Sequence, residues 1–215
     1  MPERRLRGLY LVTPDTADSA TLLALVERAL RGRPALLQYR SKQADAALKR
    51  EQAQAVAKLC RQAGVRFIVN DSLELALASG ADGVHLGRDD GGLRAARQAL
   101  GAARILGVTC YNEWSRAQEA VAAGADYVAF GAVFASPTKP AAVHAPLDLL
   151  TRARRELGVP VAAIGGITLN NAPAAIAAGA DLLAVISDVF DDPDPGARAA
   201  AYGAAFDAAS VAAAS

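Results

Sequence analysis

An alternation of short apolar segments with longer alanine- and leucine-rich segments most constrains the fold of this chain. Eight apolar segments have the length of strands, and they lie at residues 9–13, 35–40, 66–70, 83–87, 105–109, 127–133, 160–166 and 182–187. Segments of helical length separate them, among them residues 19–31, 45–63, 113–123, 147–156 and 171–178. Because the strand segments are apolar throughout, they indicate a parallel sheet covered by helices.

A short repeat, Gly-Ala-Asp, marks three of the helix-to-strand junctions, at residues 80–82, 124–126 and 179–181. Each copy closes a helical pattern, and its glycine suits the left-handed conformation that often ends a helix. Eight βα units of about 27 residues each predict a single-domain α/β fold, a (β/α)₈ (TIM) barrel, over residues 1–215. A doubly wound open sheet is the alternative, because periodicity does not show that the eighth strand pairs with the first.

Composition excludes several classes of partner. The chain is 53% hydrophobic and 21% charged, with a net charge of +1, so no overall field would attract nucleic acid or a membrane. We expect small-molecule substrates, with a homo-oligomer left open. No secretory signal or membrane-spanning run is found, and Cys60 and Cys110 cannot build a disulfide framework, which favours the cytoplasm. Cys60 is expected to be buried, and a reactive thiol at Cys110 is the minor alternative.

The active site of such a barrel lies at the carboxyl ends of the strands. The second strand ends in residues 38–42, where the period of two places Gln38, Arg40 and Lys42 on one face and Tyr39 and Ser41 on the other. Two cations and an amide aimed into a barrel mouth predict an anion there, and a diphosphate suits the arginine fork and the lysine point charge. A solvated strand end is the alternative.

Carboxylates follow the third and fourth strands. Asp71 and Asp90 together are predicted to bind Mg²⁺, which typically takes one or two carboxylates and completes its shell with water and phosphate oxygens. Alternatively, Asp71 caps the helix that begins at Ser72, and Asp89 or Asp90 caps the next helix. The pairing of two strand ends favours the metal for Asp71 and Asp90, and we expect Asp89 to be a helix cap.

Three later strand ends carry weaker signals. Residues 134–140 combine two hydroxyls and an ammonium with two prolines, which suits an anion but is also typical of any turn. Gly165, Gly166, Ile186 and Ser187 follow the seventh and eighth strands, where barrels often bind phosphate, although glycines also permit a tight turn.

The two histidines are not predicted to be catalytic. His85 alternates within the fourth strand, which is typical of a core histidine, and His144 lies in a polar loop. We find neither a nucleophile paired with a base nor a zinc-like set of cysteines and histidines.

With these residues assembled, the chain resembles the thiamine-phosphate synthase family over nearly its whole length. The motifs that carry the resemblance are QYRSK (38–42), FIVND (67–71), GVHLGRDD (83–90), GVT (107–109), SPTK (136–139), AIGGI (163–167) and VIS (185–187). The resemblance implies a (β/α)₈ barrel. It also implies a transferase that joins 4-amino-2-methyl-5-(diphosphomethyl)pyrimidine to a carboxylated thiazole phosphate. Thiamine phosphate, diphosphate and CO₂ would be the products, with Mg²⁺ as cofactor.

The resemblance also implies roles for single residues. The pyrimidine diphosphate would be held by Gln38, Tyr39, Arg40, Ser41, Lys42, Asn70, Thr109 and Lys139. The thiazole phosphate would be held by Ser136, Pro137, Thr138, Gly166, Ile186 and Ser187. Mg²⁺ would be bound by Asp71 and Asp90. The implied mechanism is dissociative, so Arg40, Lys42 and Lys139 would catalyse by stabilising the leaving diphosphate, and no strong protein base is needed.

The chain departs from the family pattern at four positions: Thr109 stands for Ser, Ser136 for Thr, Arg88 for Gln, and Ser72 for a second Asp. Arg88 adds charge beside the expected metal site. The related thiazole tautomerase would need a histidine where Tyr111 stands. A non-catalytic phosphate-binding barrel is a further alternative, favoured only if the cation site fails to bind metal. Another phosphosugar or indole-type enzyme would account for Gly165 and Gly166 but would not require the QYRSK face.

Overall fold

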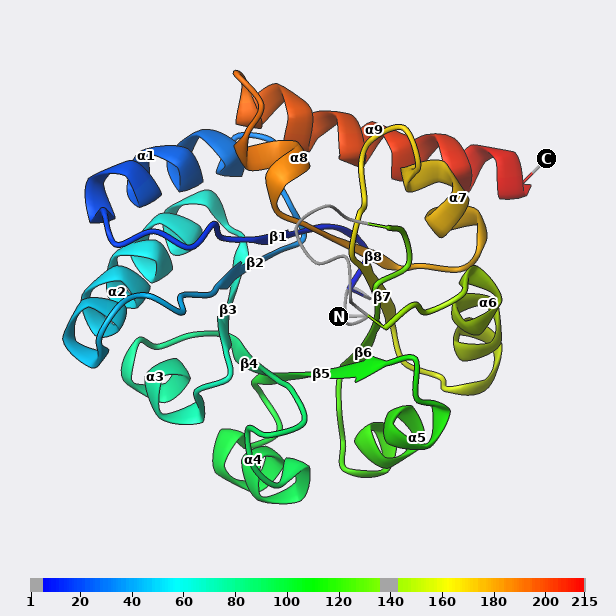
Figure 1. Cartoon of the computed structure of the whole chain (residues 1–215), viewed down its shortest axis with the longest axis horizontal. Coiled ribbons are helices and arrows are strands. Elements are labelled where there is room, and N and C mark those ends of the chain that lie inside the picture. Colours follow the sequence, from blue (N-terminus) through cyan, green and yellow to red (C-terminus); the bar gives the residue numbers. More distant parts are fainter. Residues whose placement is uncertain (1–5, 136–142, 215) are drawn as a thin grey trace.

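A closed barrel of eight parallel strands forms the centre of the molecule (Figure 1). The computed structural model describes residues 6–135 and 143–214. Its strands are β1 (Gly8–Val12), β2 (Leu36–Tyr39), β3 (Arg66–Asn70), β4 (Gly83–Leu86), β5 (Ile105–Tyr111), β6 (Tyr127–Phe130), β7 (Val161–Ile164) and β8 (Leu182–Val185). Because β8 pairs in parallel with β1, the barrel prediction is confirmed and the open sheet is excluded.

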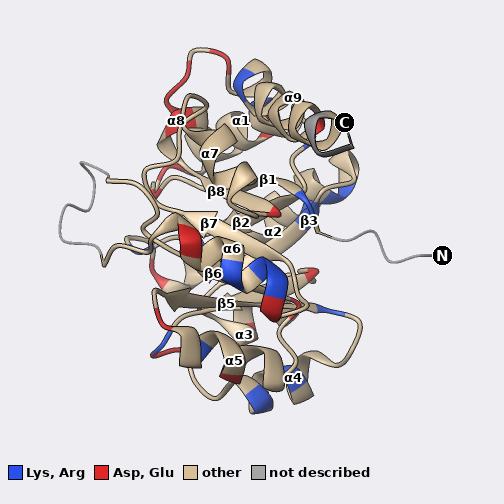
Figure 2. Cartoon of the chain, turned by 90° about the vertical axis from the view of Figure 1, so that its right-hand side faces the viewer, with Lys and Arg blue, Asp and Glu red and all other residues tan. Residues whose placement is uncertain are grey.

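Helices surround the barrel (Figure 1). Along the chain, each strand is followed by a helix. They are α1 (Ser19–Leu30), α2 (Ala46–Ala63), α3 (Leu73–Ala78), α4 (Leu93–Leu100), α5 (Trp114–Ala122), α6 (Leu147–Glu156), α7 (Ala172–Ala177), α8 (Ser187–Phe190) and α9 (Pro195–Ala214). Charged residues gather on these helices and on the loops at the barrel ends (Figure 2). None of the described helices is long and apolar enough to cross a membrane.

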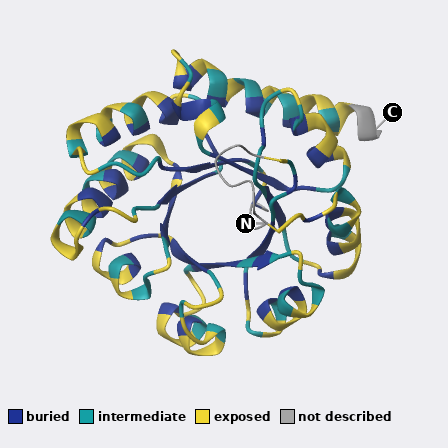
Figure 3. Ribbon diagram, in the orientation of Figure 1, coloured by how far each residue is buried: buried dark blue, intermediate teal, exposed yellow. Residues whose placement is uncertain are grey.

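The core has two layers, one on each side of the strand ring (Figure 3). The larger layer lies between strands and helices and includes Tyr39 and Cys60. The smaller layer fills the barrel and includes Tyr10, Ile68 and Tyr127. This is the arrangement expected when alternate side chains of every strand point inward and outward.

The aspartate of each Gly-Ala-Asp repeat ties its junction to the preceding strand. The Asp82, Asp126 and Asp181 carboxylates accept backbone N–H groups of Phe67, Leu106 and Val161 at 2.7, 2.7 and 3.0 Å, respectively. The backbone N–H of each aspartate also donates to the carbonyl of the same strand residue. The repeat is therefore a structural clamp at the amino-terminal end of the barrel.

Several strands end earlier than predicted. The sixth was expected to reach residue 133 but stops at Phe130, because the chain leaves the ladder there. Ala132 donates to the carbonyl of Val143, and Val133 donates to that of Ile164. β7 and β8 are also shorter, whereas β5 runs two residues further than residue 109, with a register irregularity between Thr109 and Tyr111.

Candidate active site

The residues after β2 are held by backbone contacts that leave their cationic side chains available. The Arg40 N–H donates to Thr13 Oγ1 at 2.9 Å, and Thr13 Oγ1 donates to the Arg40 carbonyl. The Asp15 carboxylate accepts the N–H of Lys42 at 3.1 Å and the hydroxyl of Ser41 at 3.3 Å. Within the described ranges, neither Arg40 nor Lys42 forms an ion pair.

The Tyr39 side chain does not reach the barrel mouth. It points outward into the helix layer, is buried, and donates its hydroxyl to Gln52 Oε1 at 2.7 Å. Burial raises its pKa. The outward direction follows from the strand alternation that turns Gln38 inward. We therefore leave the Tyr39 side chain out of the substrate site, although it is part of the QYRSK motif.

Two carboxyl groups face each other across the ends of β3 and β4. Partial burial, and then the hydrogen bond and the charge of Asp90, raise the pKa of Asp71 to about 6, while the charges of Arg40 and Lys42 oppose the rise. Asp90 Oδ2 accepts the Gly87 N–H at 2.6 Å, and the Asp71 N–H donates to the His85 carbonyl at 2.8 Å. Two carboxylates and two cations thus converge at the ends of β2, β3 and β4.

This pair of carboxylates fits Mg²⁺. Asp90 raises the pKa of Asp71, and a divalent cation between the two carboxylates would relieve that repulsion. The described residues contain no group of three or more potential His, Cys, Asp or Glu ligands, so a metal here would keep positions for water and phosphate oxygens. Coordination by one or two carboxylates, with water and phosphate oxygens in the other positions, is typical of Mg²⁺.

The helix-cap expectations for the aspartates are wrong. Ser72 itself caps α3, its hydroxyl accepting the Leu75 N–H at 3.1 Å, so Ser72 has a structural role where the family often has Asp. Helix α4 starts only at Leu93, after Gly92, without a side-chain cap. Asp89 is exposed and lies too far before the helix to cap it.

A chain of hydrogen-bonded side chains occupies the barrel interior beneath the mouth. It joins Gln38, Tyr10, Tyr127, His85 and Thr109. Burial lowers the pKa of His85 to about 4, so the ring is neutral near pH 7. We predicted His85 only as a core residue and did not single out Tyr10 or Tyr127. The signal was available, because the period of two places both tyrosines on inward-facing positions of apolar strands.

The ends of β7 and β8 form a tight backbone corner. Gly165 and Gly166 have φ values of +99° and +62°, and a Cβ on Gly166 would lie 2.5 Å from the Ala135 carbonyl oxygen. The tight turn offered as an alternative is therefore present. Helix α8 begins at Ser187, directly after Ile186; the N–H groups of Val189 and Phe190 donate to the Ile186 carbonyl, whereas those of Ser187 and Asp188 have no helical acceptor. The predicted Ser136, Pro137, Thr138 and Lys139 lie outside the described residues.

Arg88 and Cys110 both make contacts away from the cation site. Arg88 forms an ion pair with Glu113 and lies over the Tyr111 ring, 4.8 Å from its centroid, so its charge is directed to β5 and α5. Cys110 is buried, and burial raises the pKa of its thiol to about 12, which argues against the reactive-thiol alternative.

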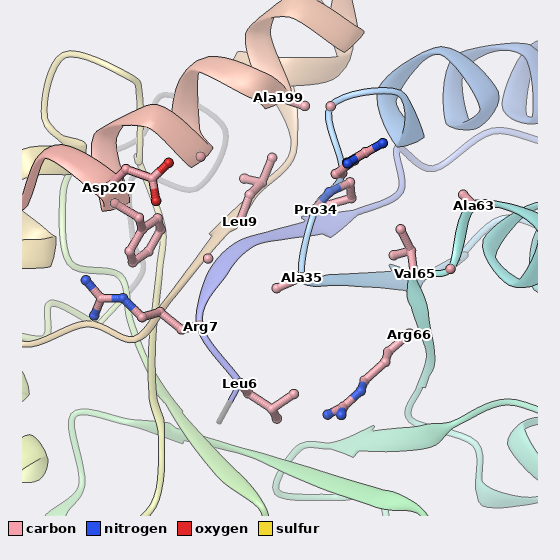
Figure 4. A pocket seen from close by; sticks show the side chains of 16 residues that line it. Leu6, Arg7, Leu9, Pro34, Ala35, Ala63, Val65, Arg66, Ala199 and Asp207 are labelled. Carbon is pink, nitrogen blue, oxygen red and sulfur yellow. The ribbon is translucent and has the colours of Figure 1, made fainter. Parts of the chain in front are cut away.

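A cavity of about 650 Å³ opens at the opposite end of the barrel (Figure 4). Its wall includes Leu6, Gly8, Ala35 and Arg66, which lie at the amino-terminal ends of β1, β2 and β3. The residues described above lie at the carboxyl ends. The cavity is therefore separate from the mouth that carries the polar groups.

Comparisons with known proteins agree with the sequence resemblance. Residues 9–189 match the family described as thiamine monophosphate synthase. A thiamine-phosphate synthase of Aromatoleum aromaticum is 75% identical over 208 residues, covering 97% of this chain and 100% of that protein. One from an Azoarcus species is 67% identical, covering 94% of this chain and 98% of that protein. The solved thiamine phosphate pyrophosphorylase of Pyrococcus furiosus has a TM-score of 0.84 at 30% identity, covering 96% of this chain and 98% of that one.

Proposed function

Because this chain belongs to the thiamine monophosphate synthase family and is a transferase that makes thiamine phosphate, we propose how its residues divide the two substrates. The observation that carries the division is the convergence of Arg40 and Lys42 with Asp71 and Asp90 at three neighbouring strand ends. Cations that lack ion-pair partners in the described ranges, beside a two-carboxylate site, suit a diphosphate that is bound together with a divalent cation.

The pyrimidine diphosphate occupies the β2 to β5 side of the mouth in this proposal. Arg40, Lys42 and Lys139 hold the diphosphate, while Gln38 and Asn70 contact the pyrimidine. Ser41 supports the loop through Asp15, and Thr109 completes the pocket from β5. Two observations support this assignment: Gln38 bonds to Tyr10 inside the barrel, and Arg40 and Lys42 have no ion-pair partner among the described residues.

Mg²⁺ is the proposed cofactor, with Asp71 and Asp90 as its protein ligands. When bound, it supplies positive charge that stabilises the leaving diphosphate. The facing carboxylates support this choice of ligands.

The proposed reaction is dissociative. The bond between the pyrimidine methylene carbon and the diphosphate oxygen breaks first, and its electron pair leaves with the diphosphate. The thiazole nitrogen then attacks the resonance-stabilised pyrimidinyl cation. The thiazole carboxylate leaves as CO₂, and the electron pair left on its ring carbon takes up a proton from water. Arg40, Lys42 and Lys139 stabilise the charge that grows on the leaving group. No strong protein base is needed in this mechanism, and His85 would be a weak one, because burial lowers its pKa to about 4.

The thiazole phosphate occupies the β6 to β8 side in this proposal. Ser136, Pro137 and Thr138 contact the substrate, and Gly166, Ile186 and Ser187 hold its phosphate. The backbone corner after β7 and the start of α8 support the assignment, because both offer N–H groups to an anion. A tautomerase activity is not favoured, since Tyr111 stands where that reaction needs histidine.

Diphosphate release from the two substrates with Mg²⁺ tests the assignment. We expect Arg40→Gln to lower kcat about 10²-fold, because one charged donor to the leaving group is lost. Arg50→Gln is the matched control, since Arg50 lies on α2 and pairs with Glu74 at the exposed surface. Wild-type turnover by purified Arg40→Gln would refute the role of Arg40.

A further inference from the structure

Five buried or half-buried polar side chains form one continuous hydrogen-bonded chain across the barrel. Gln38 Nε2 donates to Tyr10 Oη at 2.7 Å, and the two tyrosine oxygens, of Tyr10 and Tyr127, are 2.6 Å apart. Tyr127 Oη lies 2.8 Å from His85 Nδ1, and His85 Nε2 lies 2.6 Å from Thr109 Oγ1. The chain therefore connects β2 with β5 through β1, β6 and β4, and its two ends are residues of the proposed pyrimidine diphosphate site.

With Gln38 Nε2 placed toward Tyr10, counting protons fixes the direction of the other hydrogen bonds. An amide nitrogen only donates, so Tyr10 accepts from Gln38 and must give its single hydroxyl proton to Tyr127. Tyr127 then gives its own proton to His85 Nδ1. A neutral imidazole carries one proton, which must therefore be on Nε2 and be donated to Thr109.

The two ends of the chain face the mouth with opposite polarity. Gln38 Oε1 has no hydrogen-bond partner among the described residues, and Gln38 lies near the carboxyl end of β2, where the mouth is. Thr109 Oγ1 accepts from His85 and keeps its own proton for another acceptor. The mouth thus presents an acceptor from β2 and a donor from β5.

Turning the Gln38 amide by 180° would reverse every member of the chain. Tyr10 would donate to Gln38 Oε1, Tyr127 to Tyr10, and His85 would carry its proton on Nδ1. Thr109 would then donate to His85 Nε2 and present only lone pairs to the mouth. The chain consequently couples the orientation of the Gln38 amide to the polarity of Thr109.

We propose that Tyr10, Tyr127 and His85 are positioning residues that hold Gln38 and Thr109 in the polarity that an aminopyrimidine diphosphate requires. The Gln38 acceptor meets the exocyclic amino group, and the Thr109 donor meets a diphosphate oxygen. The inference rests on the proposed substrate assignment, but the direction of the chain is a property of the protein alone. A neutral His85 with its proton on Nε2 is the signature of the chain in the substrate-binding direction.

The His85 tautomer is tested directly by ¹⁵N NMR of histidine-labelled protein without substrate. The protein contains two histidines, His85 and His144. In the His144→Gln variant, all histidine signals therefore come from His85. We expect a protonated Nε2 and an unprotonated Nδ1 at pH 7. A proton on Nδ1 would overturn the proposal, and this readout does not depend on enzyme activity.

Tyr127→Phe tests whether the chain matters for substrate binding. The change removes one hydroxyl and cuts the chain at its centre. We expect kcat/KM for the pyrimidine diphosphate to fall at least about tenfold, because the Tyr127 hydroxyl bonds to both Tyr10 and His85, while the KM for the thiazole phosphate stays unchanged. The same variant should show a mixture of the two His85 tautomers.

Tyr202→Phe is the control. Tyr202 lies on helix α9, outside the barrel, and is also fully buried; the substitution removes the hydroxyl that donates to Asp188. It should keep the wild-type kcat/KM for the pyrimidine diphosphate at saturating thiazole phosphate. Wild-type kcat/KM in folded Tyr127→Phe would overturn the proposal. If Tyr127→Phe does not fold, Tyr10→Phe cuts the chain at the neighbouring position and is judged by the same criterion. A wild-type protein without synthase activity would refute the proposed function and leave the tautomer measurement as the test of the chain.

Discussion

At the scale of single residues, the interior of the barrel combines close packing with buried polar groups. Tyr127 fits only because its β5 neighbour is Gly107: a Cβ there would lie 2.1 Å from the Tyr127 ring. Within the described residues, every buried side-chain nitrogen and oxygen has a hydrogen-bond partner. Small changes at these positions should therefore have large and specific effects.

Gly107→Ala should destabilise the fold by about 1–3 kcal/mol, because the added methyl group would overlap the Tyr127 ring. Gly203→Ala is the control, since Gly203 lies within α9 with no atom within 4 Å of an added Cβ. The control should be stabilising by about 0.5–1 kcal/mol, because alanine favours helix. Urea denaturation measures both. Equal stability of Gly107→Ala and the wild type would show that the ring can move aside.

His85 should make the protein less stable as pH falls from about 6.5 to about 4. Burial lowers its pKa from 6.5 to about 4 in the folded protein, so the unfolded chain takes up a proton in this window while the folded chain does not. The stability lost is at most about 1.4 kcal/mol per pH unit. Asp71 acts in the opposite direction between 3.8 and about 6, because its raised pKa lets the folded state hold the proton there.

The difference between wild type and His85→Asn isolates the histidine, since Asp71 is present in both proteins. Denaturation at several pH values between 4 and 7.5 should show that the difference in the free energy of unfolding between the two proteins becomes smaller as the pH falls. A constant difference would contradict the predicted pKa of His85.

At the scale of elements, the site depends on how loops are anchored to strand ends. The loop after β2 is anchored by Asp15, whose carboxylate accepts the N–H groups of Lys42 and Gln43. Asp15 itself follows β1, so two neighbouring strands cooperate to hold the Arg40 and Lys42 backbone in place. This anchor could not be predicted from periodicity, because it joins loops of two separate βα units.

Asp15→Ala should raise the KM for the pyrimidine diphosphate about tenfold, because the loop that carries Arg40 and Lys42 loses its acceptor. Steady-state kinetics with each substrate varied in turn would measure this effect. Asp18→Ala is the control: its carboxylate caps α1, and its loss should lower stability by about 1 kcal/mol without changing the KM. An unchanged KM in Asp15→Ala would mean that the loop holds its shape by other contacts.

At the scale of the whole molecule, the strand order of the barrel brings together groups that are distant in the sequence. Asp71 and Asp90 meet Arg40 and Lys42 because β2, β3 and β4 are neighbours in one ring. The oligomeric state and the cytoplasmic location remain predictions from the sequence.

Mg²⁺ binding should weaken by up to about tenfold when the pH falls from 7 to 5. The metal needs the ionised carboxylate, and the pKa of Asp71 is raised to about 6, so protons compete with the metal in this range. Calorimetric titration in the presence of diphosphate measures the affinity. Asp71→Asn should abolish both the binding and its pH dependence, whereas Asp89→Asn should change neither, because Asp89 is exposed and lacks a cap role. Binding that is independent of pH would argue against Asp71 as a ligand.

The sequence by itself determined a parallel α/β fold of eight strands, because apolar strands of regular spacing can bury both faces only under helices, whereas the pairing of β8 with β1 decided for the closed barrel. It also determined which strand ends carry the cations and carboxylates, since these residues directly follow the apolar runs. The strand alternation likewise predicted that Gln38 and Tyr39 point to opposite sides, as the structure shows.

Only the tertiary structure decided which polar residues meet. Tyr10, His85 and Tyr127 are 117 residues apart at their extremes, and nothing in their local sequence marks them as hydrogen-bonded to one another. Cap positions were also misjudged, because Gly91 and Gly92 lengthen the loop before α4 and turn Asp90 back toward Gly87. Local patterns determine elements, whereas contacts across the barrel depend on ring closure and register, which sequence periodicity does not encode.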